Sequence, residues 1–191
     1  KDFKTQEEIH RMIDLREERD RVVMQVKYKG KTTWLRTFED PQMWPSEAEI
    51  GAAFKRLLHG PARVAFVNDG YERSIDKIGD RDYKVLTNLK TFRLSLISQG
   101  FENDTISLKT TDIPSNLDAL VIADPRVALD TASLRKIRQY IDAGGNLFIA
   151  GEPGKQAINN ALLQYLGVQL TAGQLLQESK DYSPELVTPY I

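Results

Sequence analysis

The feature that most constrains the fold is the alternation, after Pro61, of short apolar runs with amphipathic segments. The apolar runs have the length of buried strands and cover residues 63–67, 105–108, 118–123 and 146–150. Apolar positions three and four residues apart predict helices over residues 83–98, 131–143 and 155–166. Apolar strands that alternate with such helices are typical of a parallel sheet covered on both faces.

We therefore predict an α/β fold with a three-layer, flavodoxin-like parallel sheet as the core domain, over residues 61–170. The link over residues 108–118 is short and polar, so that crossover is expected to lack a full helix. Residues 1–60 are predicted to form an appendage of helices and a β-hairpin that packs on the core. Residues 171–191 show little periodicity and are expected to be a tail that leads to a missing region.

The appendage has its own sequence signals. The many opposite charges within residues 5–20 predict a solvated helix. Two strand-like stretches, residues 22–28 and 33–38, flank a turn at Gly30 and predict a β-hairpin. Ser46 and Glu49 fit a capping box at the start of a helix that ends before Pro61. The residues expected to face inward on that helix are Ile50, Ala53, Phe54, Leu57 and Leu58.

Composition excludes several kinds of function. The 26 basic and 27 acidic residues give a net charge of -1, which argues against a nucleic-acid partner held by bulk positive charge. The absence of cysteine excludes thiol nucleophiles, disulfides and cysteine-ligated metals. The sequence contains no apolar run long enough to span a membrane and no signal peptide. Because it starts at Lys1 rather than Met, we expect it to be a fragment of a longer protein.

Charged and glycine-rich loops follow three of the predicted strands. Ligands of open α/β sheets bind beyond the carboxyl ends of the strands, where these loops would converge. The candidate ligand-binding residues in them are Asp69, Glu72, Arg73, Asp124, Arg126, Glu152 and Lys155. The alternative interpretation is structural, because aspartate and glycine at strand ends commonly cap helices and shape turns.

Known catalytic and cofactor motifs are absent. No Gly-x-Ser-x-Gly elbow and no Gly-x-Gly-x-x-Gly loop is present, and Gly154-Lys155 lacks the rest of a phosphate-binding loop. The two histidines, His10 and His59, lie in the appendage, far from the strand ends. No catalytic residue, cofactor or metal is therefore expected. A weaker alternative is that carboxylates bind Mg²⁺ or Ca²⁺ through their oxygens. The carboxylates concerned are Asp69, Asp124 and Glu152.

Several short motifs, in order, resemble the gliding-motility-type (GldG-like) family of ABC transporter auxiliary components. They are Leu35-Arg36-Thr37-Phe38-Glu39-Asp40, Trp44-Pro45-Ser46-Glu47, Asp80-Arg81-Asp82-Tyr83, Gln99-Gly100-Phe101, Leu120-Val121-Ile122-Ala123-Asp124-Pro125 and Tyr140-Ile141-Asp142-Ala143-Gly144-Gly145-Asn146-Leu147. The resemblance covers roughly residues 22–168. It implies an extracytoplasmic, periplasmic domain of a bacterial inner-membrane protein, anchored by helices outside this sequence, with an ABC permease and ATPase as partners.

The family fold is similar to class I glutamine-amidotransferase-like domains, in agreement with the predicted parallel sheet. Members often carry Gly-His-Gly-Glu after the first core strand, where this sequence has Asp69-Gly70-Tyr71-Glu72 and so lacks the histidine. The resemblance therefore favours a non-catalytic binding or scaffolding domain of an ABC transport system. The alternative is a soluble ligand-binding domain or hydrolase that uses the strand-end carboxylates. A small-molecule ligand and self-association both stay open.

Overall fold

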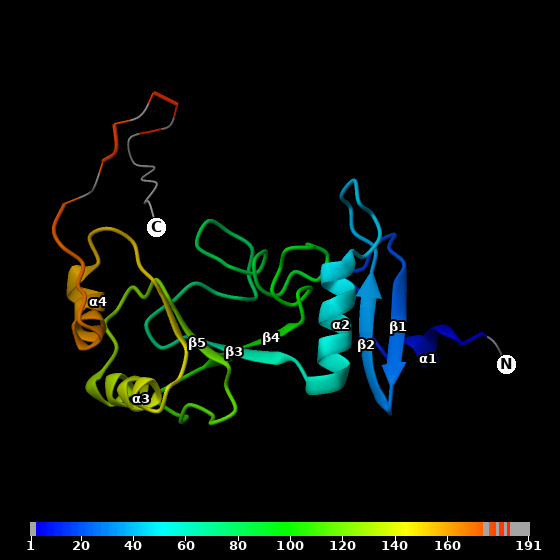
Figure 1. Cartoon of the computed structure of the whole chain (residues 1–191), viewed down its shortest axis with the longest axis horizontal. Coiled ribbons are helices and arrows are strands. Elements are labelled where there is room, and N and C mark those ends of the chain that lie inside the picture. The colour runs from blue at the N-terminus through cyan, green and yellow to red at the C-terminus, as the bar shows by residue number, and fades with distance from the viewer. Residues whose placement is uncertain (1–2, 174–175, 179, 182, 184–191) are drawn as a thin grey trace.

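The computed structural model describes residues 3–173, 176–178, 180–181 and 183. Its centre is a parallel four-stranded sheet in the order β4-β3-β5-β6 (Figure 1). The strands are β3 (Ala62–Val67), β4 (Phe101–Ile106), β5 (Ala119–Ala123) and β6 (Leu147–Ala150). In chain order this is second, first, third, fourth, the order with which flavodoxin-like sheets begin. The predicted parallel α/β core is confirmed.

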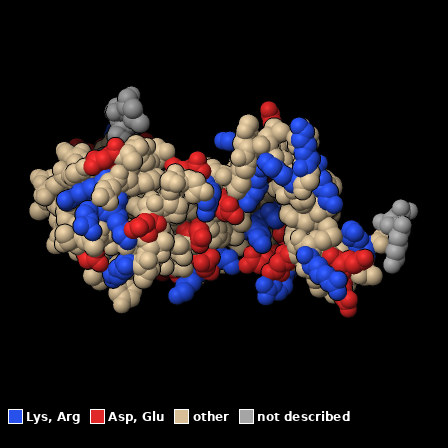
Figure 2. Space-filling view, turned by 90° about the horizontal axis from the view of Figure 1, so that it is seen from below, with Lys and Arg blue, Asp and Glu red and all other residues tan. Residues whose placement is uncertain are grey.

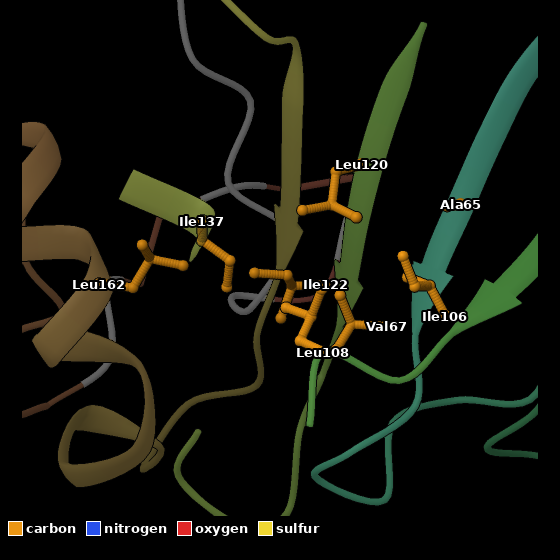
Figure 3. Close-up of a cluster of buried hydrophobic side chains, with 8 residues drawn as sticks. All are labelled: Ala65, Val67, Ile106, Leu108, Leu120, Ile122, Ile137 and Leu162. Carbon is orange, nitrogen blue, oxygen red and sulfur yellow. The ribbon is translucent and has the colours of Figure 1, made fainter. Parts of the chain in front are cut away.

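One face of the sheet is covered by the predicted helices. These are α3 (Thr131–Asp142) and α4 (Gln156–Leu163), which continues as a 3₁₀ turn, η1 (Gln164–Leu166). Figure 3 shows Ile137 of α3 and Leu162 of α4 pointing at the apolar side chains of the central strands. Asp130 caps α3 by accepting a hydrogen bond from the Ser133 N–H at 2.7 Å. This cluster is the larger apolar core of the molecule.

The other face is covered by irregular chain, so the helix predicted over residues 83–98 is wrong. Residues 71–100 form successive turns instead, and Ile75 and Leu96 from this segment pack on the sheet. The Thr87 hydroxyl donates to the Tyr83 and Ile75 carbonyls at 2.8 and 3.1 Å. Side-chain bonds of this kind compete with a regular helix. The fold is still three-layered, but one outer layer is not helical.

The second strand was predicted too late in the sequence. The expected strand over residues 105–108 is β4 (Phe101–Ile106), and Leu108 is buried in the turn that follows. Within the described part of the chain, β4 lies at an edge of the sheet and pairs with β3 alone, so much of its polar sequence faces solvent. An apolar run is therefore a poor marker of an edge strand. The crossover over residues 108–118 lacks a helix, as predicted.

The appendage contains the predicted hairpin, β1 (Val23–Tyr28) and β2 (Lys31–Arg36), paired antiparallel. Lys29 and Gly30 form its two-residue turn with φ of 47° and 79°. Positive φ at both positions is the conformation that matches the twist of a two-stranded hairpin.

Helix α2 (Glu47–His59) packs on the hairpin, and its predicted capping box is present. The Glu49 carboxylate accepts the Ser46 N–H at 2.6 Å. Ala53 and Leu57 are buried as predicted. The expectation for the neighbouring stripe of the helix is wrong, because that stripe faces solvent. Its members are Ile50, Phe54 and Leu58, which are 38%, 55% and 53% exposed.

The charged helix predicted over residues 5–20 is wrong beyond its first turns. Helix α1 covers only Gln6–His10, and the chain then continues in turns. The Asp14 carboxylate accepts hydrogen bonds from the backbone and guanidinium of Arg16, which favours a turn over a helix. Glu18 is buried against Arg36 of β2 at 2.9 Å, so tertiary pairing removes it from a solvated helix face.

Arg93 joins the appendage to the core. Its guanidinium, in the irregular layer, binds the Asp40 and Glu49 carboxylates, each at 2.6 Å, and stacks on the Phe38 ring at 4.3 Å. It also donates to the Gln42 carbonyl at 2.6 Å. Bidentate arginine pairs of this kind are geometrically specific.

Among the described residues, none of the helices has the length and apolar character needed to cross a membrane. Figure 2 shows acidic and basic side chains interspersed over most of one face of the molecule. The predicted tail falls largely outside the described residues, and the division at residues 60 and 170 stays a prediction.

Candidate functional site

The carboxyl ends of three parallel strands bring polar loops to one edge of the sheet. β3 leads into Asp69 and Gly70, β5 into Asp124, and β6 into Glu152. β3 and β5 are neighbours, although β4 separates them in the sequence. This is the point where the strand order reverses, which is the usual position of ligands in open α/β sheets.

Asp124 is the centre of this edge. The residue is 1% exposed and adopts a left-handed conformation with φ of 51°, which few residues other than glycine, asparagine and aspartate tolerate. Its N–H donates to the Ala150 carbonyl at 2.7 Å, which fixes it between β5 and β6. The backbone of β5, which leads into Asp124, and its hydrogen bond to β6 therefore fix the position from which the Asp124 side chain projects.

Two arginines and two carboxylates form a closed network here, which we call the strand-end cluster: Arg73, Arg81, Asp124 and Glu152. Arg81 contacts the Asp124 carboxylate at 2.7 Å and the Glu152 carboxylate at 3.0 Å. Arg73 binds Glu152 as well and lies 3.3 Å from the Asp124 carboxylate. Burial alone would raise the pKa of Asp124, but the hydrogen bond and charge of Arg81 outweigh it and lower the pKa. The charges of this cluster balance within the protein.

Sequence reasoning missed Arg81. The residue belongs to a loop, residues 69–82, whose dense charges predict a solvated segment. Nothing in the local pattern shows that the loop folds back over the sheet edge. The usable signal is the charge balance of the predicted site: two carboxylates beside one arginine need a second cation as a partner.

Asp69 and Glu72 lie at the start of the same loop, and each stabilises its conformation through hydrogen bonds. Asp69 accepts the Ser107 hydroxyl at 2.6 Å and the Leu108 N–H at 2.5 Å, so it ties the end of β3 to the turn after β4. Glu72 accepts the Gly70 N–H at 2.7 Å. Burial raises the pKa of Glu72, and the Asp69 charge adds to the effect.

Gly70 allows a close approach of two loops. Its carbonyl accepts the N–H groups of Arg126 and Val127 at 2.7 and 3.1 Å. A Cβ at this position would lie 2.7 Å from the Val127 carbonyl oxygen, so a larger residue would push the loops apart.

The last two predicted residues do not join the network. The Arg126 side chain is exposed and the Lys155 side chain half-buried, and neither makes a hydrogen bond or ion pair within the part of the chain that the structure describes. The structure thus brings together Arg73, Asp124 and Glu152, and leaves the other four predicted residues outside the strand-end cluster.

The arrangement limits the chemistry of this edge. Within the described ranges, no group of three or more His, Asp or Glu side chains is placed to bind a metal ion. Asp124 and Glu152 already neutralise two guanidinium groups, so a cation would have to displace an arginine. A ligand site formed by the seven predicted residues stays a prediction.

The comparisons with known proteins identify the family. A search of curated proteins finds no match. Among solved structures, the mmIFT52 N-terminal domain is similar at 15% identity and a TM-score of 0.46, with 64% of this chain covered. This chain spans 53% of that one. Residues 62–190, more than half of the chain, match the family described as an ABC-type uncharacterized transport system. The chain therefore belongs to this family of ABC transport auxiliary proteins.

Proposed function

We propose that the chain is a non-catalytic, extracytoplasmic binding or scaffolding domain that works beside the permease and ATPase of a bacterial ABC transport system. The family match over residues 62–190 carries the transport role. The resemblance to gliding-motility-type auxiliary components supports the finer assignment of partners and of the periplasmic face of the membrane.

The strand-end cluster supports a role without catalysis. A general acid or base needs a side chain that can reach a substrate and change its protonation there. Asp124 is buried and its pKa is lowered by Arg81, while Glu152 is held by two arginines. These carboxylates are committed to holding three loops together. The hydrolase alternative would need them to be free.

The test uses the full-length protein in its own cells, tagged at the exposed hairpin turn, Lys29-Gly30. We expect it in the membrane fraction, cleaved by protease added outside the inner membrane, and cross-linked to permease and ATPase subunits. A cytoplasmic protein without transporter subunits would overturn the proposal. Glu152→Gln serves as the control for the alternative, because a hydrolase would lose turnover in this variant while cross-linking stayed unchanged.

A further inference from the structure

A cavity of about 240 Å³ lies between the appendage and the core, away from the strand-end cluster. Its walls come chiefly from β2, from α2 and from residues 90–100 of the irregular layer, and Ile13 of the chain after α1 completes them. Representative lining residues are Thr33 and Trp34 of β2, Ala53 and Arg56 of α2, and Lys90 and Ser98. Three segments far apart in the sequence therefore meet around one hollow.

The charged groups of this cavity do not balance. Three cations line it, Arg36, Arg56 and Lys90, but Glu49 is its one lining carboxylate among the described residues. Glu49 is already paired with Arg93 at 2.6 Å. Arg36 is already paired with buried Glu18 at 2.9 Å. Within the described residues, two cations of this cavity are left without an ion-pair partner.

Arg56 and Lys90 are those two cations. Within the described ranges, the side chain of half-buried Arg56 makes one hydrogen bond, to the Phe101 carbonyl at 3.5 Å, and the Lys90 ammonium group makes none. Asp14 is near enough for Lys90 to lower its pKa slightly, but its hydrogen bonds go to Arg16. A second cavity of about 370 Å³ shares Arg56 and Lys90, so both can be approached from two sides. Glu17, Asp76 and Glu102 also line this second cavity, but within the described residues none of them forms an ion pair with Arg56 or Lys90.

We propose that this cavity binds a small oxyanion, a phosphate or carboxylate group, held between Arg56 and Lys90. A partly buried cation is stabilised when an anion pairs with it. The guanidinium group can form two hydrogen bonds at once with a phosphate or with a carboxylate. The Thr33 hydroxyl lines the same wall and forms no hydrogen bond with any described residue, so it is available as a third donor. At ~30 Å³ per water, the volume suits a small organic or inorganic anion rather than a nucleotide.

The inference does not depend on the transport role, because it rests on the charges and shape of the cavity. Trp34 lines the cavity and provides the readout. The chain has two tryptophans, and Trp44 is 58% exposed. Trp44→Phe therefore leaves Trp34 as the sole tryptophan. This variant of the 191-residue chain is titrated with sodium phosphate and, separately, with sodium succinate, each against sodium chloride of equal ionic strength.

We expect saturable changes in Trp34 emission with phosphate, succinate or both, and the responding anion distinguishes the two sources of the oxyanion. Arg56→Gln and Lys90→Gln, each checked for folding by circular dichroism, should each weaken binding about tenfold or more. Lys27→Gln makes the same charge change on the exposed hairpin outside the cavity and should bind normally. No saturable response to either anion, or unchanged binding in folded Lys90→Gln, would overturn the proposal.

Discussion

Two charged regions of this molecule use the same residue types in opposite ways. The strand-end cluster pairs two arginines with two carboxylates and leaves no net charge to offer a ligand. The cavity between appendage and core exposes Arg56 and Lys90 without a carboxylate partner among the described residues. The position that fold rules favour for a ligand is thus occupied by the protein's own side chains. A candidate binding site is therefore distinguished from a structural network by charged side chains that have no ion-pair partner, rather than by its position in the fold.

The largest expected effect comes from breaking the strand-end cluster. Asp124→Asn keeps the side-chain shape and the tolerance for positive φ, but it leaves Arg73 and Arg81 without the buried charge between them. Removing one partner of a buried ion pair should lower the free energy of unfolding by about 3 kcal/mol. Urea denaturation measures it. Asp80→Asn, an exposed change in the same loop, should stay within about 0.5 kcal/mol, and equal effects would refute the structural role.

Arg93→Lys tests how firmly the cavity walls are joined. Lysine keeps the charge but cannot bind Asp40, Glu49 and the Gln42 carbonyl together. We expect a loss of about 2 kcal/mol in unfolding free energy by urea denaturation. Arg11→Lys, on the exposed chain after α1, is the matched control. A loss no larger than that of the control would mean that appendage and core are joined elsewhere.

Acid should weaken the paired regions. The folded-state pKa values of Asp124, Asp40 and Glu49 lie below their ordinary values. Arginine pairing lowers the pKa of Asp40 and, where it outweighs burial, that of Asp124. For Glu49, the hydrogen bonds with Ser46 and the charge of Arg93 together outweigh burial. Their stabilising contribution is therefore complete above about pH 5 and is lost as the pH falls through the lowered values. Thermal melts from pH 6 downward measure this. The loss should be shallower in Asp124→Asn, and an unchanged slope would contradict the pairing.

Glu72 should behave in the opposite sense. Its pKa is raised by burial, so the folded state prefers the protonated form and the ionised carboxylate opposes folding above that raised pKa. Glu72→Gln keeps an acceptor for the Gly70 N–H and removes the charge. We expect a gain of up to about 1 kcal/mol at neutral pH, measured by urea denaturation, which disappears in acid. A loss of stability at neutral pH would show that the charge is needed.

The smallest effect is expected at the cavity. The Lys90 ammonium group forms no hydrogen bond or ion pair with a described residue, so Lys90→Gln should change the unfolding free energy by less than about 0.5 kcal/mol in chloride. In the salt of the anion to which Trp34 responds, phosphate or succinate, the same variant should lose the ligand-dependent rise in melting temperature that the unaltered chain shows. Thermal melts in the two salts compare them. A large loss in chloride would instead make Lys90 a structural residue like Arg81.

The sequence predicts the parts of this fold whose signals are local. The capping box at Ser46, the hairpin turn at Gly30 and the apolar strand β5 each depend on a few adjacent residues, and each is found as expected. The errors arise where distant contacts decide. The segment over residues 83–98 has helical spacing, yet Thr87 bonds to Ile75 and the chain folds back on itself.

The same distinction holds for the candidate site. Strand-end carboxylates can be named from the sequence, because parallel strands deliver their carboxyl ends to one edge. Their partner Arg81 could not, since it comes from a loop whose path over the sheet edge has no local signal. The cavity was missed for a related reason. Its walls come chiefly from β2, α2 and the irregular layer, whose contacts exist only after the appendage docks.

The most direct test of this comparison is the mapping of backbone amide and tryptophan indole N–H chemical shifts while phosphate and, separately, succinate are added to the isotopically labelled chain. The account predicts shifts that saturate at Arg56, Lys90 and the Trp34 side chain, and amides at Asp124 and Glu152 that do not move. Shifts confined to Asp124 and Glu152 would contradict it, because the strand-end cluster would then be the binding site.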